Sequence, residues 1–137
     1  MASIFELEQP VFDRMNASIE LVAASDEATT LTAAQSVNSL VVMTPTASRN
    51  VTTATAAAIV AELGSGVRVG TTFRIILRNQ AAATYAMTLV GGTGVTLDAD
   101  NTNTAAAAST REFIGRVTAI ASGSEAVTVY SMPSGTH

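Results

Sequence analysis

Three glycines stand close together in residues 64–70, and glycine-rich loops of this kind can hold a phosphate group. A phosphate loop precedes a helix, because the free amides at a helix N-terminus point at the anion. Here Gly64, Gly66 and Gly70 follow a helical pattern instead, at the end where outward carbonyl groups repel phosphate. The spacing therefore predicts a helix cap and a turn, and not a nucleotide-binding loop.

A second group with possible chemistry is the acidic loop over residues 98–103, DADNTN. Asp98 and Asp100 occupy the first and third positions of a calcium-binding loop. Asn103 stands where that loop has glycine, and Ser109 stands where it has glutamate. We interpret the segment as a polar loop between strands, with a weak surface cation site as the alternative.

The remaining residues with catalytic potential do not form a recognisable pattern. His137 is the only histidine and the last residue, whereas a Ser-His-Asp site needs an oriented, partly buried base. The carboxylate pairs Asp98/Asp100 and Glu6/Glu8 could act as acid and base in a small hydrolase, but no pattern around them indicates burial. The sequence therefore predicts a protein that is not an enzyme and uses no cofactor or metal.

Composition excludes several other classes. The 137-residue chain has a net charge of −4 and no lysine, and its arginines do not cluster, so nucleic acid is not an expected partner. It has no cysteine, which excludes disulfides and cysteine-based zinc sites. It has no apolar run of the roughly 18 residues that a membrane span needs. No signal-peptide pattern is present, so synthesis in a cytoplasm is expected.

The sequence predicts a mainly β fold, which must position the candidate residues named above. Alternating apolar residues predict strands at 18–23, 28–34, 36–44, 71–79, 84–90, 95–98, 110–121 and 126–132. A short helix is expected at about 54–63, with Thr53 or Thr55 as N-cap and Gly64 as C-cap. The glycines of GGTG predict a hairpin between 84–90 and 95–98, and the last five residues are expected to fray.

The predicted architecture is a β-sandwich or jelly roll of about eight strands with one short helix and an extended N-terminal arm. Ile76, Ile114 and Val22 are expected to point away from the main apolar faces, which favours burial in an oligomer. Four arginines, Arg74, Arg78, Arg111 and Arg116, lie on predicted strands. They are either solvent-face charges or partners for acidic groups on another subunit or protein.

The first 15 residues, MASIFELEQPVFDRM, differ from the rest of the chain, so we divide it into an arm, 1–15, and a single β domain, 16–137. Pro10 limits regular strand pairing, and the apolar residues follow no helical or strand period. The candidate partner-binding anchors are Ile4, Phe5, Leu7, Val11 and Phe12. The arm either orders on a partner or packs on its own domain, for example as an edge strand.

Three stretches carry a resemblance to a known family: TTATAAAIVAELGSGVRVGTTFRIILRN, GGTGVTLD and STREFIGRVTAIASGSEAVTVYSM. Over about residues 50–132 the chain resembles small structural proteins of tailed bacteriophages, among them the capsid decoration, or cement, proteins of phages that include cyanobacterial ones. The resemblance implies a virion structural protein on the outer capsid surface. Its implied partners are the major capsid protein and further copies of itself, with a homotrimer favoured over a dimer.

Similar modules occur in phage fibres and tails, so the alternative is a head-fibre or tail adhesin module that binds the host cell surface. An adhesin of this kind predicts exposed aromatic side chains that stack on sugars. Tyr85 and Tyr130 are the candidates for that role.

Overall fold

The computed structural model describes residues 18–98 and 102–137. Within these residues the chain forms eleven strands in two sheets, one α-helix and one short 3-10 helix. The predicted mainly β class is therefore confirmed. The predicted arm, 1–15, with its five anchors, lies outside the described residues, as does Asp100.

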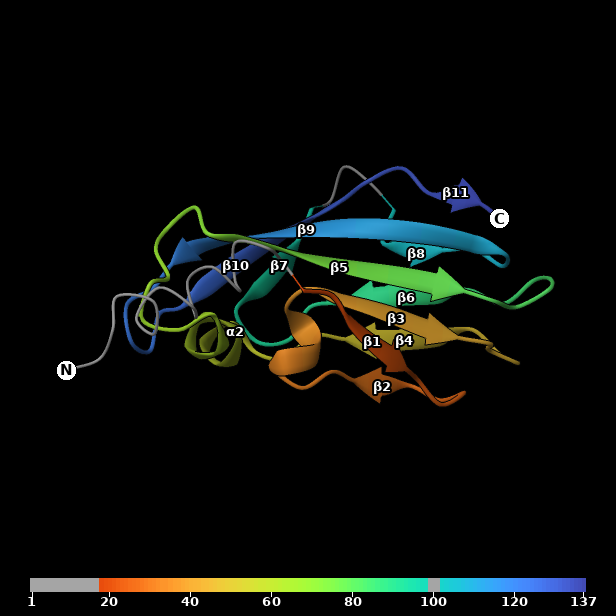
Figure 1. Cartoon of the computed structure of the whole chain (residues 1–137), viewed down its shortest axis with the longest axis horizontal. Coiled ribbons are helices and arrows are strands. Elements are labelled where there is room, and N and C mark those ends of the chain that lie inside the picture. Colours follow the sequence, from red (N-terminus) through yellow and green to blue (C-terminus); the bar gives the residue numbers. More distant parts are fainter. Residues whose placement is uncertain (1–17, 99–101) are drawn as a thin grey trace, which may run out of the picture.

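The larger sheet, sheet A, has seven strands and forms one layer of the molecule. In spatial order they are β1 (Glu20–Ala23), β3 (Ser39–Met43), β5 (Thr72–Asn79), β9 (Ser109–Ala119), β10 (Ala126–Ser131) and β7 (Val95–Leu97), with β11 (Gly135–Thr136) also pairing with β9. In Figure 1, β1, β3, β5 and β9 lie in this order across the picture.

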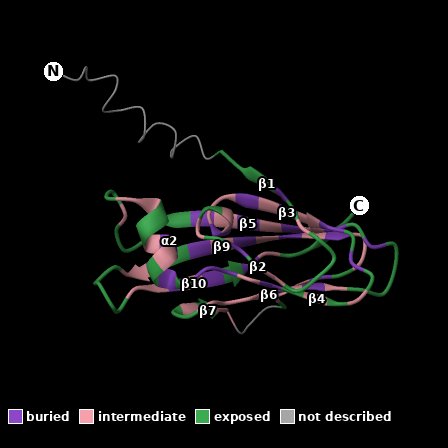
Figure 2. Ribbon diagram, turned by 90° about the horizontal axis from the view of Figure 1, so that it is seen from below, coloured by how far each residue is buried: buried purple, intermediate pink, exposed green. Residues whose placement is uncertain are grey.

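The smaller sheet, sheet B, forms the second layer. Its strands are β2 (Thr29–Thr30), β4 (Arg49–Thr52), β6 (Met87–Val90) and β8 (Thr104–Ala105), in this order. The two helical segments are η1 (Ala34–Ser36), after β2, and α2 (Ala56–Leu63), after β4. Figure 2 shows α2 at one end of the two layers.

The first six strands alternate between the two sheets. The strands β1, β3 and β5 are parallel neighbours in sheet A, and β2, β4 and β6 are parallel neighbours in sheet B. The chain therefore makes three successive turns of a two-sided coil, each giving one strand to each sheet. A jelly roll is antiparallel, so of the two predicted architectures the structure is the sandwich.

The second half of the chain completes both layers. Long β9 pairs antiparallel with β5 on one side and with β10 on the other. Short β11 continues along the edge that β10 occupies, pairing Gly135 with Thr110. The last residues, expected to fray, are therefore paired, and the backbone N–H of His137 donates to Ala108 O at 2.9 Å.

The hairpin predicted from GGTG is wrong. Strand β6 ends in sheet B, whereas β7 lies in sheet A beside β10, so the glycines carry the chain from one layer to the other. They are needed because the crossing passes close to other backbone. A Cβ at Gly92 would lie 2.6 Å from Thr53 O, and one at Gly94, where φ is +81°, would lie 2.8 Å from Ala56 Cβ.

The core lies between the sheets and follows strand alternation. On β5 and β9, the inward side chains Phe73, Ile75, Leu77, Phe113 and Val117 are all buried. Figure 2 shows the buried residues along β5, β9 and β10 and the exposed ones on the connecting loops. Strand β1 has the opposite phase to the prediction: Val22 is buried, while Leu21 points outward.

The helix prediction is confirmed with a shift of two residues at its start. Thr55 is the N-cap, and its side-chain oxygen accepts from Ala58 N at 3.2 Å. Gly64, with φ at +85°, ends the helix after Leu63. Strands β4, β8 and β11 were not predicted, and the strand expected at 28–34 is limited to Thr29–Thr30.

Candidate functional site

The glycines of residues 64–70 lie where the sequence predicted a cap and a turn. The N–H of Gly64 donates to Ala61 O at 3.1 Å, within the last turn of α2. Gly70, with φ at +96°, precedes β5, and its N–H donates to Val117 O at 2.8 Å. These glycines shape the connection between α2 and β5.

The acidic loop is only partly described. The backbone N–H of Asp98 donates to Val129 O at 2.8 Å, which extends the pairing of β7 with β10. Asp100 and the pair Glu6/Glu8 lie outside the described residues. Over residues 18–98 and 102–137, no group of three or more His, Asp or Glu side chains could hold a metal ion.

Buried polar groups in the described region bind the backbone. Arg111 is buried on the inner face of β9, where Nε donates to Thr104 O at 2.7 Å and Nη1 to Met132 O at 2.5 Å. It thereby joins β8 to the segment after β10. Buried Asn79 similarly donates through Nδ2 to Tyr85 O at 2.8 Å and to Ala105 O at 3.0 Å. Both side chains have structural roles.

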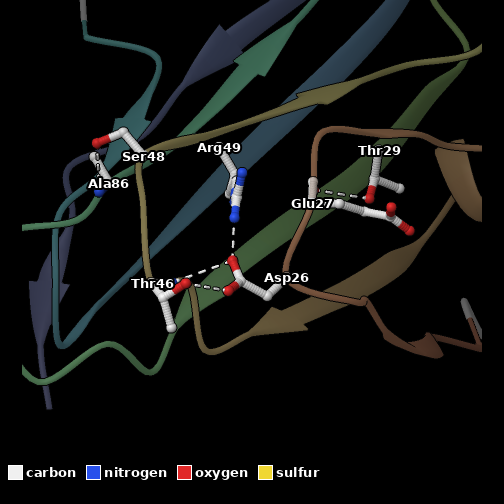
Figure 3. A network of polar contacts seen from close by, with 7 residues as sticks. All are labelled: Asp26, Glu27, Thr29, Thr46, Ser48, Arg49 and Ala86. Carbon is white, nitrogen blue, oxygen red and sulfur yellow. Dashed lines mark hydrogen bonds and ion pairs between the residues drawn. The ribbon is translucent and has the colours of Figure 1, made fainter.

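A polar network joins successive turns of the coil (Figure 3). Asp26, between β1 and β2, accepts from Arg49 Nε at 2.8 Å and from Thr46 N at 3.1 Å, and it also accepts from the Thr46 hydroxyl. The hydrogen bond from Arg49, aided by those from Thr46, lowers the pKa of Asp26 to about 2. Ser48 Oγ accepts from Ala86 N at 3.2 Å, and this hydrogen bond joins the second turn of the coil to the third.

The outer face of sheet A carries a group of large apolar side chains. We define it as the side of the sheet turned away from sheet B. Leu21, Leu40 and Ile76 form one row across β1, β3 and β5, because each is the register partner of the next. Ile114 lies beside Tyr130 in a neighbouring row. Leu21 is 66% exposed and Tyr130 is 38% exposed.

The same face carries mostly positive charge. Arg74, Arg78 and Arg116 point outward, against one outward carboxylate, Glu112. Arg74 Nη1 lies 3.8 Å from Glu112 Oε2, and in the part of the chain that the structure describes Arg78 and Arg116 form no ion pair. Since the whole chain has a net charge of −4, this face differs in sign from the rest of the molecule.

The sequence predicted part of this surface. Ile76 and Ile114 point outward as expected, and so do three of the four strand arginines. The prediction for Arg111 as an outward charge was wrong, and the signal that could have corrected it was present. Arg111 has the same parity as Phe113 and Val117, which share the buried face of β9.

No known protein family, curated protein or solved structure matches this chain. Neither helical segment in the described residues is long and apolar enough to cross a membrane. Among the described residues, the feature that best suits a function is a surface: the apolar, arginine-bearing outer face of sheet A.

Proposed function

We propose that the protein is a virion structural protein that decorates and stabilises an icosahedral capsid by binding the major capsid protein lattice. The observation that supports this proposal is the outer face of sheet A, with its row of Leu21, Leu40 and Ile76. An apolar face of this kind suits binding to another protein surface. The resemblance of about residues 50–132 to phage decoration proteins points to the same role.

Stabilisation would follow from mass action. A protein that binds the assembled shell, and not its free subunits, shifts the equilibrium toward the shell. The row of aliphatic side chains supplies apolar contact, and Arg78 and Arg116 can form bidentate pairs with carboxylates of the lattice. The candidate anchors of residues 1–15 add further contacts, and many copies on one lattice add avidity.

The proposal is tested by co-sedimentation with capsids that lack the protein. The double variant Leu40→Lys/Ile76→Lys should bind at least tenfold more weakly, because burying one such side chain contributes roughly 1.5–3 kcal/mol. Deleting residues 1–15 should also weaken binding. The matched control is Asn50→Lys, an exposed position on β4 of sheet B, which should bind as the wild type does.

Circular dichroism and thermal melting show whether each variant is folded. Failure of the wild-type protein to co-sediment would contradict the proposal. So would equal binding by the folded double variant and the wild type.

A second candidate, an adhesin module that binds cell-surface glycans, is favoured by one observation. Tyr85 is 40% exposed and Tyr130 is 38% exposed. The two side chains do not form one platform. Tyr130 shares a row with Ile114 and Arg74, whereas the carbonyl oxygen of Tyr85 accepts from Asn79, which lies five residues after Arg74 on β5. Strong, saturable glycan binding that is lost in Tyr85→Ala or Tyr130→Ala would favour this role.

A further inference from the structure

We propose that residues 1–15 of this chain bind the outer face of sheet A while the protein is free in solution. This inference does not depend on the proposed function, because it concerns the protein without any particle. It assigns an occupant to a surface that the described residues leave exposed. The argument rests on apolar content, charge and chain length.

Both partners are rich in apolar side chains. The outer face offers the row of Leu21, Leu40 and Ile76, and diagonally beside it the pair Ile114 and Tyr130. The segment supplies five large apolar side chains, Ile4, Phe5, Leu7, Val11 and Phe12. An extended segment can place several of them on one sheet face, since each buried Phe or Leu contributes roughly 1.5–3 kcal/mol.

The charges of the two partners are opposite. Residues 1–15 contain three acidic side chains, Glu6, Glu8 and Asp13, and one basic one, Arg14. The outer face carries the reverse, with Arg74, Arg78 and Arg116 against Glu112. Complementary charges favour this pairing, whereas the same face of a second copy would bring like charges together. The acidic, apolar segment is therefore the better occupant.

The chain also places the segment close to this face. The described residues begin at Ser18, two residues before β1, and β1 is the edge strand of sheet A. Fifteen extended residues reach at most about 50 Å. Six strands spaced by about 4.8 Å make a face roughly 24 Å wide. The segment can therefore span the face of its own molecule or that of a neighbouring copy.

Docking of this kind has a consequence for capsid binding. It would cover the row of Leu21, Leu40 and Ile76 in the free protein and so limit unspecific association. A lattice that binds the same face would have to displace the segment.

The absence of cysteine allows a direct test with the full chain. In the variant Phe5→Cys/Ile76→Cys, mild oxidation without capsids should form a disulfide at least tenfold faster than in the matched control Phe5→Cys/Asn50→Cys. Asn50 is exposed on sheet B, so both variants carry one cysteine in the segment and one on a strand. A cross-linked monomer indicates docking within one molecule, a cross-linked dimer indicates docking between copies, and both support the proposal.

Charge provides the second measurement. Adding Arg78→Glu to the Phe5→Cys/Ile76→Cys variant should slow disulfide formation severalfold, and 1 M salt should slow it in the parent variant. Circular dichroism checks the fold, and Leu40→Cys replaces Ile76→Cys if the latter does not fold. Equal rates for the outer-face pair and the sheet B pair would overturn the proposal. Since no capsid is present, that result would leave the proposed decoration role standing.

Discussion

Opposite Phe73, the core has room for a hydrogen atom and no larger group. Gly115 is the register partner of Phe73, and a Cβ at Gly115 would lie 2.2 Å from the ring. The buried ring lies over the glycine, which explains why a long central strand contains one. The ring of Phe73 therefore packs directly against the backbone of Gly115 on the neighbouring strand.

We predict that Gly115→Ala lowers the free energy of unfolding by about 1–3 kcal/mol, because a methyl group has to displace a packed ring. Urea unfolding monitored by circular dichroism measures the effect as a lower midpoint with an unchanged slope. Gly135→Ala is the matched control, since a Cβ there meets no atom within 4 Å. Equal stability of the two variants would mean that the ring moves aside at no cost.

Single residues also show what the sequence could reveal and where it failed. The strand predicted at 110–121 includes Phe113, Gly115 and Val117, which alternate along it and form the buried face of β9. Arg111 continues the same alternation, but its charge suggested an outward position. Only the fold supplies the reason for its burial, because the carbonyl groups of Thr104 and Met132 that it binds come from other elements.

The elements of the coil are held together at their turns as well as by strand pairing. Asp26, between β1 and β2, binds Thr46, in the turn before β4, and Arg49, the first residue of β4. The network is partly exposed, so its contribution depends on the ionisation of Asp26 more than on burial. Acid should therefore weaken the contact between the first and second turns of the coil at this network.

We predict that acid weakens this network over a defined pH range. The hydrogen bonds from Arg49 and Thr46 lower the pKa of Asp26 from 3.8 to about 2, so the contribution to stability is present above pH 3.8 and is lost as the pH falls toward 2. Arg49→Met should raise the pKa of Asp26, measured by NMR titration of its carboxyl carbon. Arg68→Met, at an exposed site outside the network, should leave it unchanged. An Asp26 titration that is the same in both variants would contradict the role of Arg49.

The sequence predicted strands better than it predicted their pairing. Alternation along residues 71–79 and 110–121 marks β5 and β9, because each has one buried face. Strand partners are a different matter: Leu21, Leu40 and Ile76 form one row although long stretches of chain separate them. The glycines of GGTG have the local signature of a hairpin, but they are needed for close approach to Thr53 and Ala56.

At the scale of the whole molecule, the first turn of the coil has no neighbouring strands on one side within the described residues. The strands β1 and β2 are the edge strands of the two sheets and belong to the first turn of the coil. Leu21 on β1 is exposed, and so is Ile19 just before the strand. Unpaired edges and apolar faces are sites of association unless something covers them. Both features meet at β1, which four residues, 16–19, separate from the predicted arm.

The proposed function could be derived from the sequence only through resemblance. The residues of a decoration surface are ordinary aliphatic and arginine side chains, and nothing in their spacing distinguishes them from core or solvent positions. Leu21 illustrates this, since the sequence placed it with the apolar core and the structure places it outside. Only the register of β1 against β3 shows that Leu21 lies beside Leu40 on the outer face.

We predict that the protein is a homotrimer, with a dimer as the alternative. Contact between residues 1–15 of one copy and the outer face of another joins two different surfaces, and such heterologous contacts form a ring of three copies where each contact turns the next copy by a third of a circle. A twofold contact between two outer faces is disfavoured, because Arg74, Arg78 and Arg116 of both copies would meet. The resemblance to decoration proteins also favours three copies.

Light scattering at high micromolar concentration should therefore give three times the 14.0 kDa mass of the chain. Ile76→Lys should shift the mass toward that of the single chain, because it places a charge at the end of the apolar row, whereas Asn50→Lys on sheet B should leave the trimer intact. A 14.0 kDa species for the wild-type protein would contradict the trimer. Combined with a cross-linked monomer in the cysteine experiment, that mass would mean that each copy covers its own outer face and that contacts between copies form only on the particle.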